Sequence, residues 1–399
     1  MKKVTIVVPT YWTWPTNVNG RKVESIFDHP TPLDMDGTLA RTLESFKKLS
    51  YPNFDVVVIS AATNKQIRAE VEKKVKEIID RFKNDFDIIQ FSYTQLDRLK
   101  ERLWDLGYDK ILDEINLENY NNIRNLQLIV SHLKESDVVV GIDDDEIITD
   151  KDYLKKAIEY VGTEYKGVKV AGVAGYYLDE KGNHRLNLDD HSYSDNLFDK
   201  KHYLMDLTFE MLDKCEDRLV RSPVVFGGNM VIPRSTFEEV SFDPYNTRGE
   251  DIDYLINARM EGMYFFLDKE LNVVHLPPSY DTAHNGFNLS KLKQDILRFV
   301  YEKEKLEQVK KHDDLNNIDI EELMPYPGSF FDNKLYKDAE EKLMKMLVKK
   351  DARREAVEFV KMAKRRAVEL VPKYFEFRLL WKDMMKNIKD DCKLKNYLQ

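Results

Sequence analysis

Short apolar runs alternate with amphipathic stretches along the first 145 residues of the chain. The apolar runs predict buried parallel strands, with Pro9 ending the first of them, and apolar residues at helical spacing predict helices between them. The expected strands are Val4–Val8, Asp55–Ile59, Asp87–Phe91 and Val138–Ile142, and the expected helices are Leu39–Phe46, Lys65–Lys83 and Asn116–Leu133. This alternation is typical of βαβ units. It predicts an α/β fold with a Rossmann-like, mostly parallel sheet flanked by helices, and ligands beyond the carboxyl ends of the strands.

The pattern becomes less regular after residue 145 and mostly helical after Pro278. The expected strands here are Val168–Leu178, Tyr264–Leu267 and Val273–Val274, the expected helices begin at Pro233 and Glu250, and Asp179–Glu216 is expected to be irregular. Residues 337–399 carry 18 Lys and Arg against 11 Asp and Glu, a charge of +7, which leaves −16 for the remainder. We therefore expect an α/β domain over residues 1–285 and a mainly helical C-terminal extension over residues 286–399.

The overall composition narrows the classes of function. The 399 residues carry 62 Lys and Arg against 71 Asp and Glu, a net charge of −9, which argues against a nucleic-acid partner. The two cysteines, Cys215 and Cys392, lie far apart without metal-ligand spacing, as is typical of thiols in a reducing cytosol. No apolar stretch approaches the ~18 residues of a membrane span, and none resembles a signal peptide. We expect a soluble, cytoplasmic protein.

The strongest chemical feature is a cluster of four consecutive acids, Asp143–Glu146, directly after an expected buried strand. Adjacent carboxylates repel one another unless a cation lies among them, and oxygen ligands suit Mg²⁺ or Mn²⁺. Alternate residues of an extended chain point the same way, so Asp143 and Asp145 are placed to reach one ion together. The alternative is a solvated acidic turn before a helix at Lys151.

A series of short motifs runs in a fixed order from the first strand to residue 278. They are Val4–Tyr11, Thr38–Phe46, Tyr51–Ile59, Asn122–Asn125, Asp143–Asp145, Gly227–Asn229 and Gly249–Asp251. Together they resemble glycosyltransferase family 2 and its relatives, which have the GT-A fold, a single α/β domain that binds a nucleotide-diphosphate sugar. The resemblance covers residues 3–278. It implies that residues 1–285 form a GT-A catalytic domain and that the protein is a hexosyltransferase.

The resemblance also implies the substrates and the cofactor. The donor would be a UDP- or GDP-sugar and the acceptor a hydroxyl group on a glycan, a small molecule or a lipid-linked molecule, with Mn²⁺ or Mg²⁺ as the metal. Asp143 and Asp145 fall at the family's Asp-X-Asp metal motif, and His275 is similar to a late histidine ligand of some GT-A enzymes. The alternative for His275 is a partly buried histidine that closes a strand.

The remaining site residues follow from the same resemblance. The implied nucleotide-sugar contacts are Pro9, Thr10, Tyr11, Ser60, Arg124, Asp143, Asp144, Gly228 and Asn229. The family's usual Asp-Asp pair after the second strand is replaced here by Ser60-Ala61-Ala62, which leaves the choice between UDP and GDP open.

The catalytic residues implied by the resemblance are Asp251 and Glu250. If the reaction inverts the anomeric centre, Asp251 is the general base that takes the proton of the acceptor hydroxyl. If the reaction retains the configuration, Asp251 instead holds the acceptor or the sugar. The alternative is that both acids are simply favourable residues for the first turn of a helix.

The long segment of residues 12–36 allows two further interpretations. Trp12, Trp14 and His29 either line a sugar or acceptor pocket or pack a surface loop. Asp34-Met35-Asp36-Gly37-Thr38 matches the nucleophile motif of haloacid-dehalogenase-type phosphatases. That motif needs an apolar strand directly before its first Asp, whereas two prolines precede Asp34 here, so we favour the glycosyltransferase.

The basic C-terminal residues also leave two alternatives. Lys349-Lys350, Arg353-Arg354 and Lys364-Arg365-Arg366 lie on amphipathic stretches. They form either a patch for peripheral contact with the inner face of a membrane or a helical appendage that packs on the acidic domain or forms a homodimer. We favour the second alternative.

Overall fold

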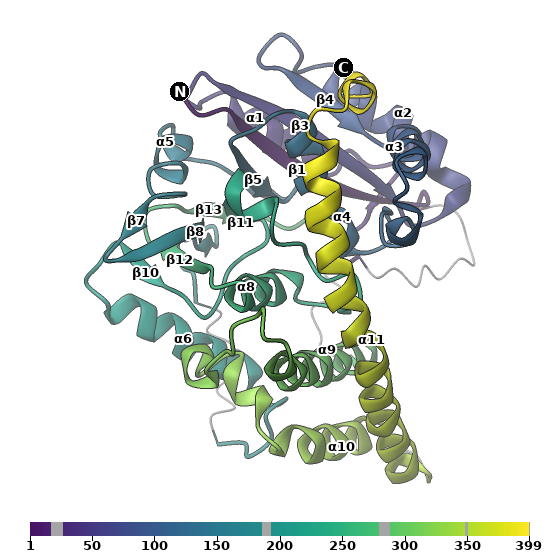
Figure 1. Cartoon of the computed structure of the whole chain (residues 1–399), viewed down its shortest axis with the longest axis vertical. Coiled ribbons are helices and arrows are strands. Elements are labelled where there is room, and N and C mark those ends of the chain that lie inside the picture. Colours follow the sequence, from purple (N-terminus) through teal and green to yellow (C-terminus); the bar gives the residue numbers. More distant parts are fainter. Residues whose placement is uncertain (17–26, 186–192, 279–287, 348–349, 399) are drawn as a thin grey trace.

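The computed structural model describes residues 1–16, 27–185, 193–278, 288–347 and 350–398. A large mixed sheet lies at its centre (Figure 1). Its strands, in spatial order, are β10 (Leu219–Arg221), β12 (Tyr264–Asp268), β8 (Val168–Ala174), β11 (Asn229–Pro233), β5 (Val138–Ile142), β1 (Val4–Thr13), β3 (Phe54–Ala62) and β4 (Ile88–Phe91), with β2 (Thr31–Pro32) beside β1 and β7 (Glu164–Tyr165) beside β8. Strands β5, β1, β3 and β4 are parallel, and β11 is antiparallel to both neighbours. The expected α/β fold with a mostly parallel sheet is confirmed.

The first strand is longer than expected. β1 runs through Pro9 to Thr13 and pairs in register with β3 from Val4 to Trp12, whereas its pairing with β5 ends at Val7. Between Val7 and the short pairing with β2 at Trp12, β3 is the one partner of β1 among the described strands. A proline lacks only a hydrogen-bond donor, and at such an edge-like position that donor is not needed.

Helices cover the parallel half of the sheet close to where they were expected. α1 (Leu39–Phe46) precedes β3, α2 (Arg68–Ile79) packs on β3 and β4, and α4 (Tyr120–Leu133) packs on β1, β3 and β5. The pattern of apolar residues did not predict α3 (Tyr93–Asp105), although Ser92 and Gln95 form a capping box at its start. Short 3₁₀ turns lie at Lys65–Ile67 and Asp109–Ile111.

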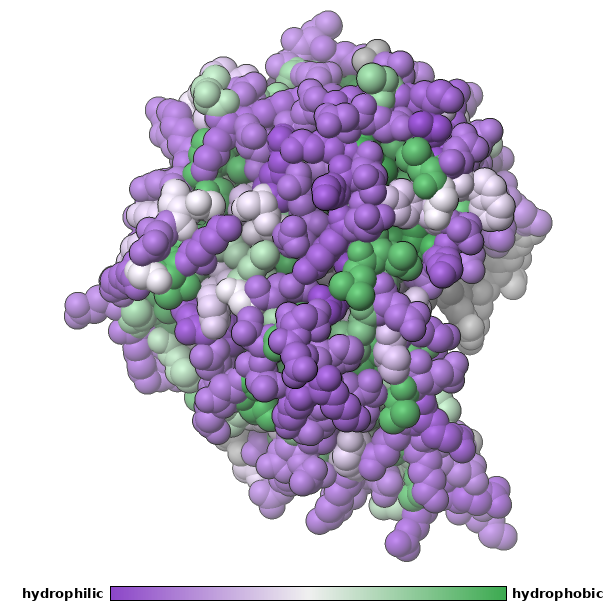
Figure 2. All heavy atoms as spheres, in the orientation of Figure 1, coloured by the Kyte–Doolittle hydropathy of each residue, from purple (hydrophilic) through white to green (hydrophobic). Residues whose placement is uncertain are grey.

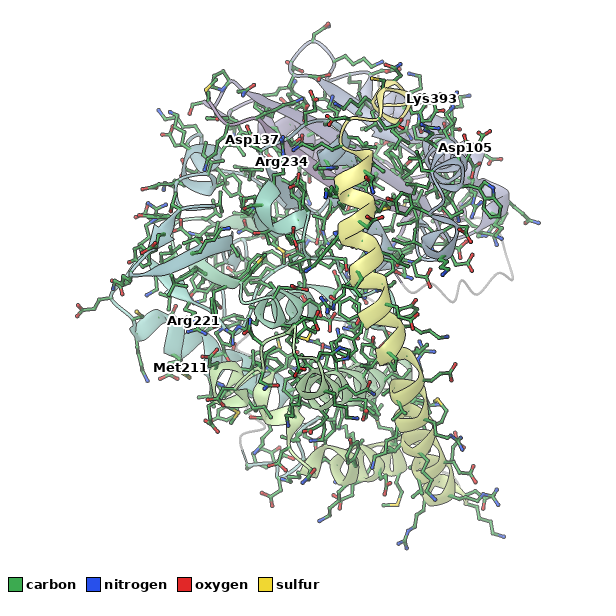
Figure 3. All side chains as sticks on the ribbon, viewed as in Figure 1. Asp105, Asp137, Met211, Arg221, Arg234 and Lys393 are labelled. Atoms are coloured by element: carbon green, nitrogen blue, oxygen red, sulfur yellow. The ribbon has the colours of Figure 1, made fainter. Side chains whose placement is uncertain are left out.

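The middle of the chain adds shorter helices, which are α5 (Tyr153–Ala157), α6 (Lys201–Lys214), α7 (Arg234–Phe237) and α8 (Glu250–Met260). The prediction of an irregular segment over Asp179–Glu216 was wrong in its second half, because α6 forms there and buries Leu204, Phe209 and Leu212. At the start of α7, Arg234 lies beside Asp137 at the foot of β5, with 3.6 Å between Nη2 and Oδ1 (Figure 3).

A second, smaller sheet lies beyond the carboxyl end of β5. It contains β6 (Glu146–Ile147), β13 (Val273–His275) and β9 (Tyr177–Leu178), with β13 in the middle. β13 is antiparallel to β6, and the register places His275 opposite Glu146. This pairing brings residues 275 and 146 to one place although 129 residues separate them in the chain.

The C-terminal region is helical, as expected. It contains α9 (Leu289–Gln308), α10 (Lys334–Leu347), α11 (Ala352–Ile388) and α12 (Cys392–Asn396), with 3₁₀ turns at Val309–Lys311, Ile320–Leu323 and Gly328–Phe331. α11 runs along much of the molecule in Figure 1, from α10 up to the sheet. Near its end, Trp381 Nε1 donates to the carbonyl of Phe237 at 3.0 Å, and Arg102 of α3 lies 2.7 Å from Asp391. The division at residue 285 stays a prediction.

Most of the apolar face of α11 is covered by the rest of the chain. Ala356, Val360, Ala363, Ala367 and Val371 are buried, and α11 packs on α9 and α10. Figure 2 shows a mainly hydrophilic face with scattered hydrophobic residues. Among the described residues, no helix combines the length and the apolar character that crossing a membrane requires. The membrane and dimer interpretations of the basic residues stay predictions.

Candidate active site

The four-acid cluster lies where β5 ends, in a tight turn that leads into β6. Thr10, near the end of the neighbouring β1, donates its hydroxyl to Asp144 Oδ2 at 2.6 Å. The hydroxyl of Thr42 donates to the backbone carbonyl of Asp144 at 2.8 Å, and the N–H of Asp143 donates to Glu146 Oε2 at 3.0 Å. The turn is therefore held from several sides and does not form a solvated loop.

Burial and mutual repulsion disfavour the ionised forms of these acids. Burial, with the charges of neighbouring acids, raises the pKa of Asp143 and raises the pKa values of Asp144 and Glu146 well above their ordinary range. Glu146 Oε1 is buried and has no hydrogen-bond partner among the described residues. Because a buried polar atom without a partner is costly, it points to a group that the turn is built to receive.

His275 reaches the cluster from the small sheet. Its Nε2 lies 3.2 Å from Asp145 Oδ2, and the N–H of Leu276 donates to the carbonyl of Asp145 at 2.8 Å. Burial would lower the pKa of His275, but the hydrogen bond with Asp145 raises it. Burial would likewise raise the pKa of Asp145, but His275 lowers it. Each group therefore favours the charged form of the other.

Arg124 connects the cluster to the start of α8. It lies in the first half of α4, is almost fully buried, and places Nη2 2.8 Å from Asp143 Oδ1 and Nε 3.4 Å from Glu250 Oε1. A side chain on Gly227 would collide with the guanidinium, since an added Cβ would lie 2.8 Å from Nη2. Nη1 has no partner among the described residues. Nη2 and Nε therefore contact Asp143 and Glu250, and Nη1 is left to donate hydrogen bonds to a ligand.

The Glu250–Asp251 pair begins α8, as the motif predicts. Asp251 Oδ1 accepts from the N–H of Ile252 at 2.8 Å, and Oδ2 accepts from the N–H of Gly227 at 3.3 Å. Burial, followed by the charge of Asp251, raises the pKa of Glu250 to about 7, against the opposing effect of Arg124. A carboxyl group with a pKa near 7 is suited to exchange protons at neutral pH.

Aromatic residues surround the cluster, and the sequence analysis identified one of them, Tyr11. Tyr11 stacks on Phe27 with 4.3 Å between ring centroids and meets the edge of Tyr120 at 5.3 Å. Tyr177, which no motif indicated, accepts a hydrogen bond from the N–H of Gly228 at 2.6 Å. An added Cβ on Gly228 would lie 2.6 Å from side-chain atoms of both Asp143 and Glu146, so a glycine is required there.

Three of the residues expected to contact the ligand, Asn229, Ser60 and Pro9, are buried in the fold. Asn229 is fully buried and its amide is used internally, with Oδ1 accepting from Tyr153 at 2.6 Å and Nδ2 donating to the carbonyl of Leu271 at 2.8 Å. Ser60 is buried and accepts from Gln90 Nε2 at 3.0 Å. Pro9 is buried within β1.

The segment of residues 12–36 is not a single loop. Trp12 belongs to β1, is fully buried, and donates from Nε1 to Thr10 Oγ1 at 3.0 Å. Trp12 therefore supports Thr10, which in turn donates to Asp144 of the cluster. Trp14 packs against the core, and His29 contributes to lowering the pKa of Asp145 against the effect of burial. Residues 17–26 lie outside the described residues.

An open cleft of about 990 Å³ adjoins His275. Its lining comes from three segments of the chain. They are residues 34–38 with Arg41, residues 179–181, and residues 275–278. Asp34 accepts hydrogen bonds from the backbone and hydroxyl of Thr16, and among the described residues 27–33 the one strand before it is the two-residue β2. Asp34 thus lacks the buried strand end that the phosphatase motif requires.

The metal-ligand prediction has partial geometric support. Asp145 and His275 lie together, but Asp143 is paired with Arg124. In the described part of the chain, no three His, Cys, Asp or Glu side chains are arranged so that they enclose a metal ion. The donor atoms still suit a hard cation, because Asp143 and Glu146 converge on the space left by Gly228 and Glu146 Oε1 is unpartnered.

Comparisons with known proteins give structural likenesses only. No family model matches the chain, and no curated protein matches it. A mannosyltransferase from Pyrobaculum calidifontis, solved with GDP-mannose and Mn²⁺, is 13% identical with a TM-score of 0.42, covering 100% of this chain and 85% of its own. A cytidylyltransferase from Leptospira borgpetersenii is 15% identical with a TM-score of 0.32, covering 74% and 87%. Mouse xyloside xylosyltransferase 1 is 12% identical with a TM-score of 0.30, covering 63% and 79%. Likenesses at this level assign no function.

Proposed function

We propose that this protein is a metal-dependent glycosyltransferase that moves a sugar from a UDP- or GDP-sugar to a hydroxyl acceptor. One observation carries the proposal. A continuous chain of charged contacts runs from Glu250 through Arg124 to Asp143 and so joins the acids of α8 to the cluster at the end of β5. A cation site, a phosphate-binding guanidinium and a proton acceptor are the three parts that the reaction needs.

Arg124 would bind the diphosphate of the donor. When the bond between the sugar and the diphosphate breaks, negative charge develops on the departing nucleotide, and a fixed cation stabilises it. Arg124 is held by Asp143 and Glu250 and keeps Nη1 without a partner, so it is preorganised to donate a charge-assisted hydrogen bond to a phosphate oxygen.

Asp145, His275, Asp143 and Glu146 are the residues that would hold the metal. Their oxygen and imidazole donors suit Mn²⁺ or Mg²⁺. Such an ion, when bound, supplies Lewis-acid stabilisation of the leaving diphosphate. On the protein side, burial and then the charges of neighbouring acids raise the pKa values of Asp143 and Glu146, and a bound cation would favour the ionised form of both.

The acids of α8 would act on the acceptor. Asp251 is fixed by the N–H groups of Gly227 and Ile252, so its position does not depend on a flexible rotamer. In an inverting reaction Asp251 would take the proton of the acceptor hydroxyl as its oxygen bonds to the sugar and the sugar–diphosphate bond breaks, while Arg124 would offset the negative charge of Glu250. In a retaining reaction Asp251 holds the acceptor or the sugar. Tyr11 and Tyr177 would form walls of the site, and the cleft beside His275 would be its entrance.

The proposal is tested by metal-dependent nucleotide binding and by nucleotide release. We expect Mn²⁺ with UDP or GDP to raise the melting temperature, and we expect release of UDP or GDP from one member of a nucleotide-sugar panel. Asp145→Asn should abolish both effects, whereas Asp152→Asn, which changes an acid paired with Lys155 near the end of β6, should leave both intact. The proposal fails if the native protein shows neither effect or if Asp145→Asn retains them.

A further inference from the structure

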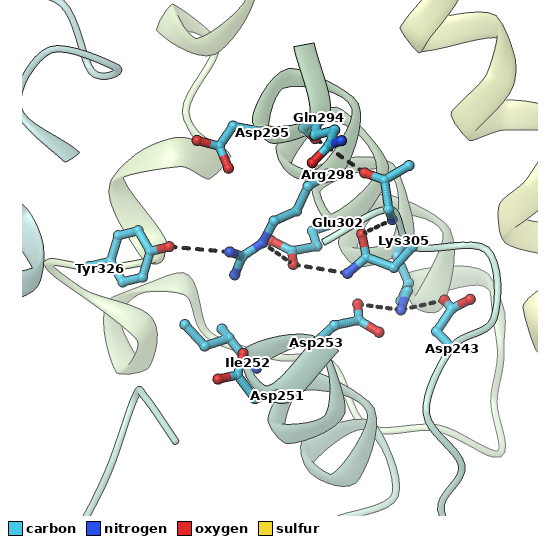
Figure 4. A network of polar contacts seen from close by, with 12 residues as sticks. Asp243, Asp251, Ile252, Asp253, Gln294, Asp295, Arg298, Glu302, Lys305 and Tyr326 are labelled. Atoms are coloured by element: carbon cyan, nitrogen blue, oxygen red, sulfur yellow. Dashed lines mark hydrogen bonds and ion pairs between the residues drawn. The ribbon is translucent and has the colours of Figure 1, made fainter. Parts of the chain in front are cut away.

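Buried ion pairs and hydrogen bonds join helix α9 of the C-terminal region to α8 and to the segment that leads into it. Lys305 is completely buried and lies 2.6 Å from Asp243 and 2.6 Å from Asp253. Glu302, also buried, accepts from Asn246 Nδ2 at 3.4 Å. Figure 4 shows these contacts as one network that joins two turns of α9 to α8 and to the loop before it. The start of α8 therefore depends on α9 for its position.

Arg298 lies at the centre of this network, directly beneath the N-cap of α8. Its Nε donates to Glu302 Oε1 at 2.8 Å and its Nη1 to the hydroxyl of Tyr326 at 3.3 Å. Gly249, the N-cap, has φ +65°, and an added Cβ would lie 2.1 Å from the Arg298 guanidinium carbon. Gly249 is thus a glycine for two reasons, because its backbone is left-handed and because the guanidinium occupies the adjacent space.

The charge of Asp251 is felt by Arg298. Burial opposes protonation of Arg298, yet Glu302, with a smaller contribution from Asp251, raises the pKa of Arg298 well above its ordinary value. Figure 4 places Asp251 at the end of α8 that faces Arg298. The guanidinium therefore has Glu302 as its ion-pair partner and Asp251 as a weaker electrostatic neighbour.

We propose that Arg298 is a positioning residue for the Glu250–Asp251 pair, so that the C-terminal helical region completes the active site. The inference rests on the proposed function for its catalytic meaning. The residue packs against Gly249, the N-cap directly before the two acids, and Asp251 contributes to the electrostatic stabilisation of its charge. Arg298 itself touches neither the cluster nor the diphosphate-binding Arg124.

A purely stabilising role does not account for this arrangement. Arg298 is 4% exposed, and its Nη2 has no hydrogen-bond partner among the described residues. Glu302 Oε2 is also without one. A buried ion pair with an unmet donor and an unmet acceptor is more costly than apolar packing of the same shape. The position of Arg298 beside the first residues of α8 explains why the chain has this ion pair here instead of apolar residues.

The test separates positioning from stability. Arg298→Met alone leaves Glu302 without its ion-pair partner. The double variant Arg298→Met with Glu302→Leu therefore removes both charges and keeps the side-chain volumes similar. The first readout is hydrogen exchange of the Gly227 and Ile252 amides, which donate to Asp251. The second is steady-state kinetics with whichever nucleotide sugar the native protein turns over. Arg298→Lys restores the charge, and Arg378→Met is the control, a buried arginine of α11 outside the site.

We expect the double variant to exchange the Gly227 and Ile252 amides about 10-fold faster and to lose about 10²-fold in kcat with the donor KM unchanged, as misplacement of a catalytic group does. Arg298→Lys should recover most of both, and the control should change neither. The proposal is overturned if these amides and kcat stay at native values, or if exchange rises throughout α9 and donor KM rises with it. A native protein that turns over no nucleotide sugar overturns the proposed function instead, and the two amides still decide whether Arg298 positions Asp251.

Discussion

Replacing Arg124 by methionine removes the one guanidinium that lies between the two acidic parts of the site. Arg124 is 3% exposed, and its ion pairs with Asp143 and Glu250 measure 2.8 and 3.4 Å. The variant leaves two carboxylates without a partner beside further acids. Breaking a buried ion pair in this way costs about 3–5 kcal/mol. Because the Asp143 side chain is 28% exposed and gains water, we expect the lower end, about 3 kcal/mol, at pH 8.

The same reasoning makes the cost depend on pH. Burial already raises the pKa of Glu250 to about 7 and raises the pKa of Asp143, and Arg124 opposes both shifts. Without Arg124 the folded-state pKa values rise further above those of the unfolded chain. The folded variant then holds protons that the unfolded chain releases, so its stability falls as pH rises through this range. At pH 5.5, below the pKa of about 7, Glu250 is largely neutral, and the cost of Arg124→Met should be clearly smaller than at pH 8.

Urea denaturation at pH 5.5 and pH 8 measures this difference. The control is Arg378→Met, which removes an equally buried arginine that pairs with Glu261 and Asp314 away from the site. Its hydrogen bond to Asp314 lowers the pKa of that acid, which is therefore ionised at both pH values, so the control should cost the same at both. A loss for Arg124→Met below about 1 kcal/mol at pH 8, or one that does not change with pH, would refute the reasoning.

Two further predictions concern buried charges away from the site. Lys305→Met leaves Asp243 and Asp253 facing each other without a cation, so the free energy of unfolding, measured with urea at pH 8, should fall by about 3–5 kcal/mol; a loss under 1 kcal/mol would contradict the importance of the network. His132 is buried, which lowers its pKa to about 4. The unfolded chain then takes up the proton first, so stability should fall by about 2.5 kcal/mol between pH 7 and pH 4.5, and His132→Leu should flatten that decline; an unchanged pH dependence would show that another group is responsible.

Much of the fold follows from local pattern. Buried parallel strands such as β5 are continuous apolar runs, because both faces of the sheet are covered, and such runs are visible in sequence. The elements that were missed depend on context. β1 continues through Pro9 only because β5 stops pairing with it at Val7, and α6 forms in a polar segment where a few apolar residues meet the rest of the core. Neither cause is a property of the segment itself.

The site was predictable where one short motif defines it. Asp143–Glu146, Arg124 and the Glu250–Asp251 pair lie together as the motif order implied. The contact between His275 and Asp145 depends on the register of β13 with β6, which no local pattern specifies. The Asn229 amide is used for contacts inside the fold, which a motif does not show because it does not specify which way a side chain faces.

The register of β13 on β6 also has a consequence for folding. His275 and Glu146 come together only when segments far apart in the chain have both joined the small sheet, and such distant pairings form late because loop closure costs entropy. The intact site is therefore a property of the complete fold, and partly folded chains lack it. A nucleotide that binds there recognises the native state alone and should protect it by about 2.7 kcal/mol at a concentration 100 times its Kd. If the proposed function holds, the free energy of unfolding of this protein would therefore rise with the concentration of the nucleotide.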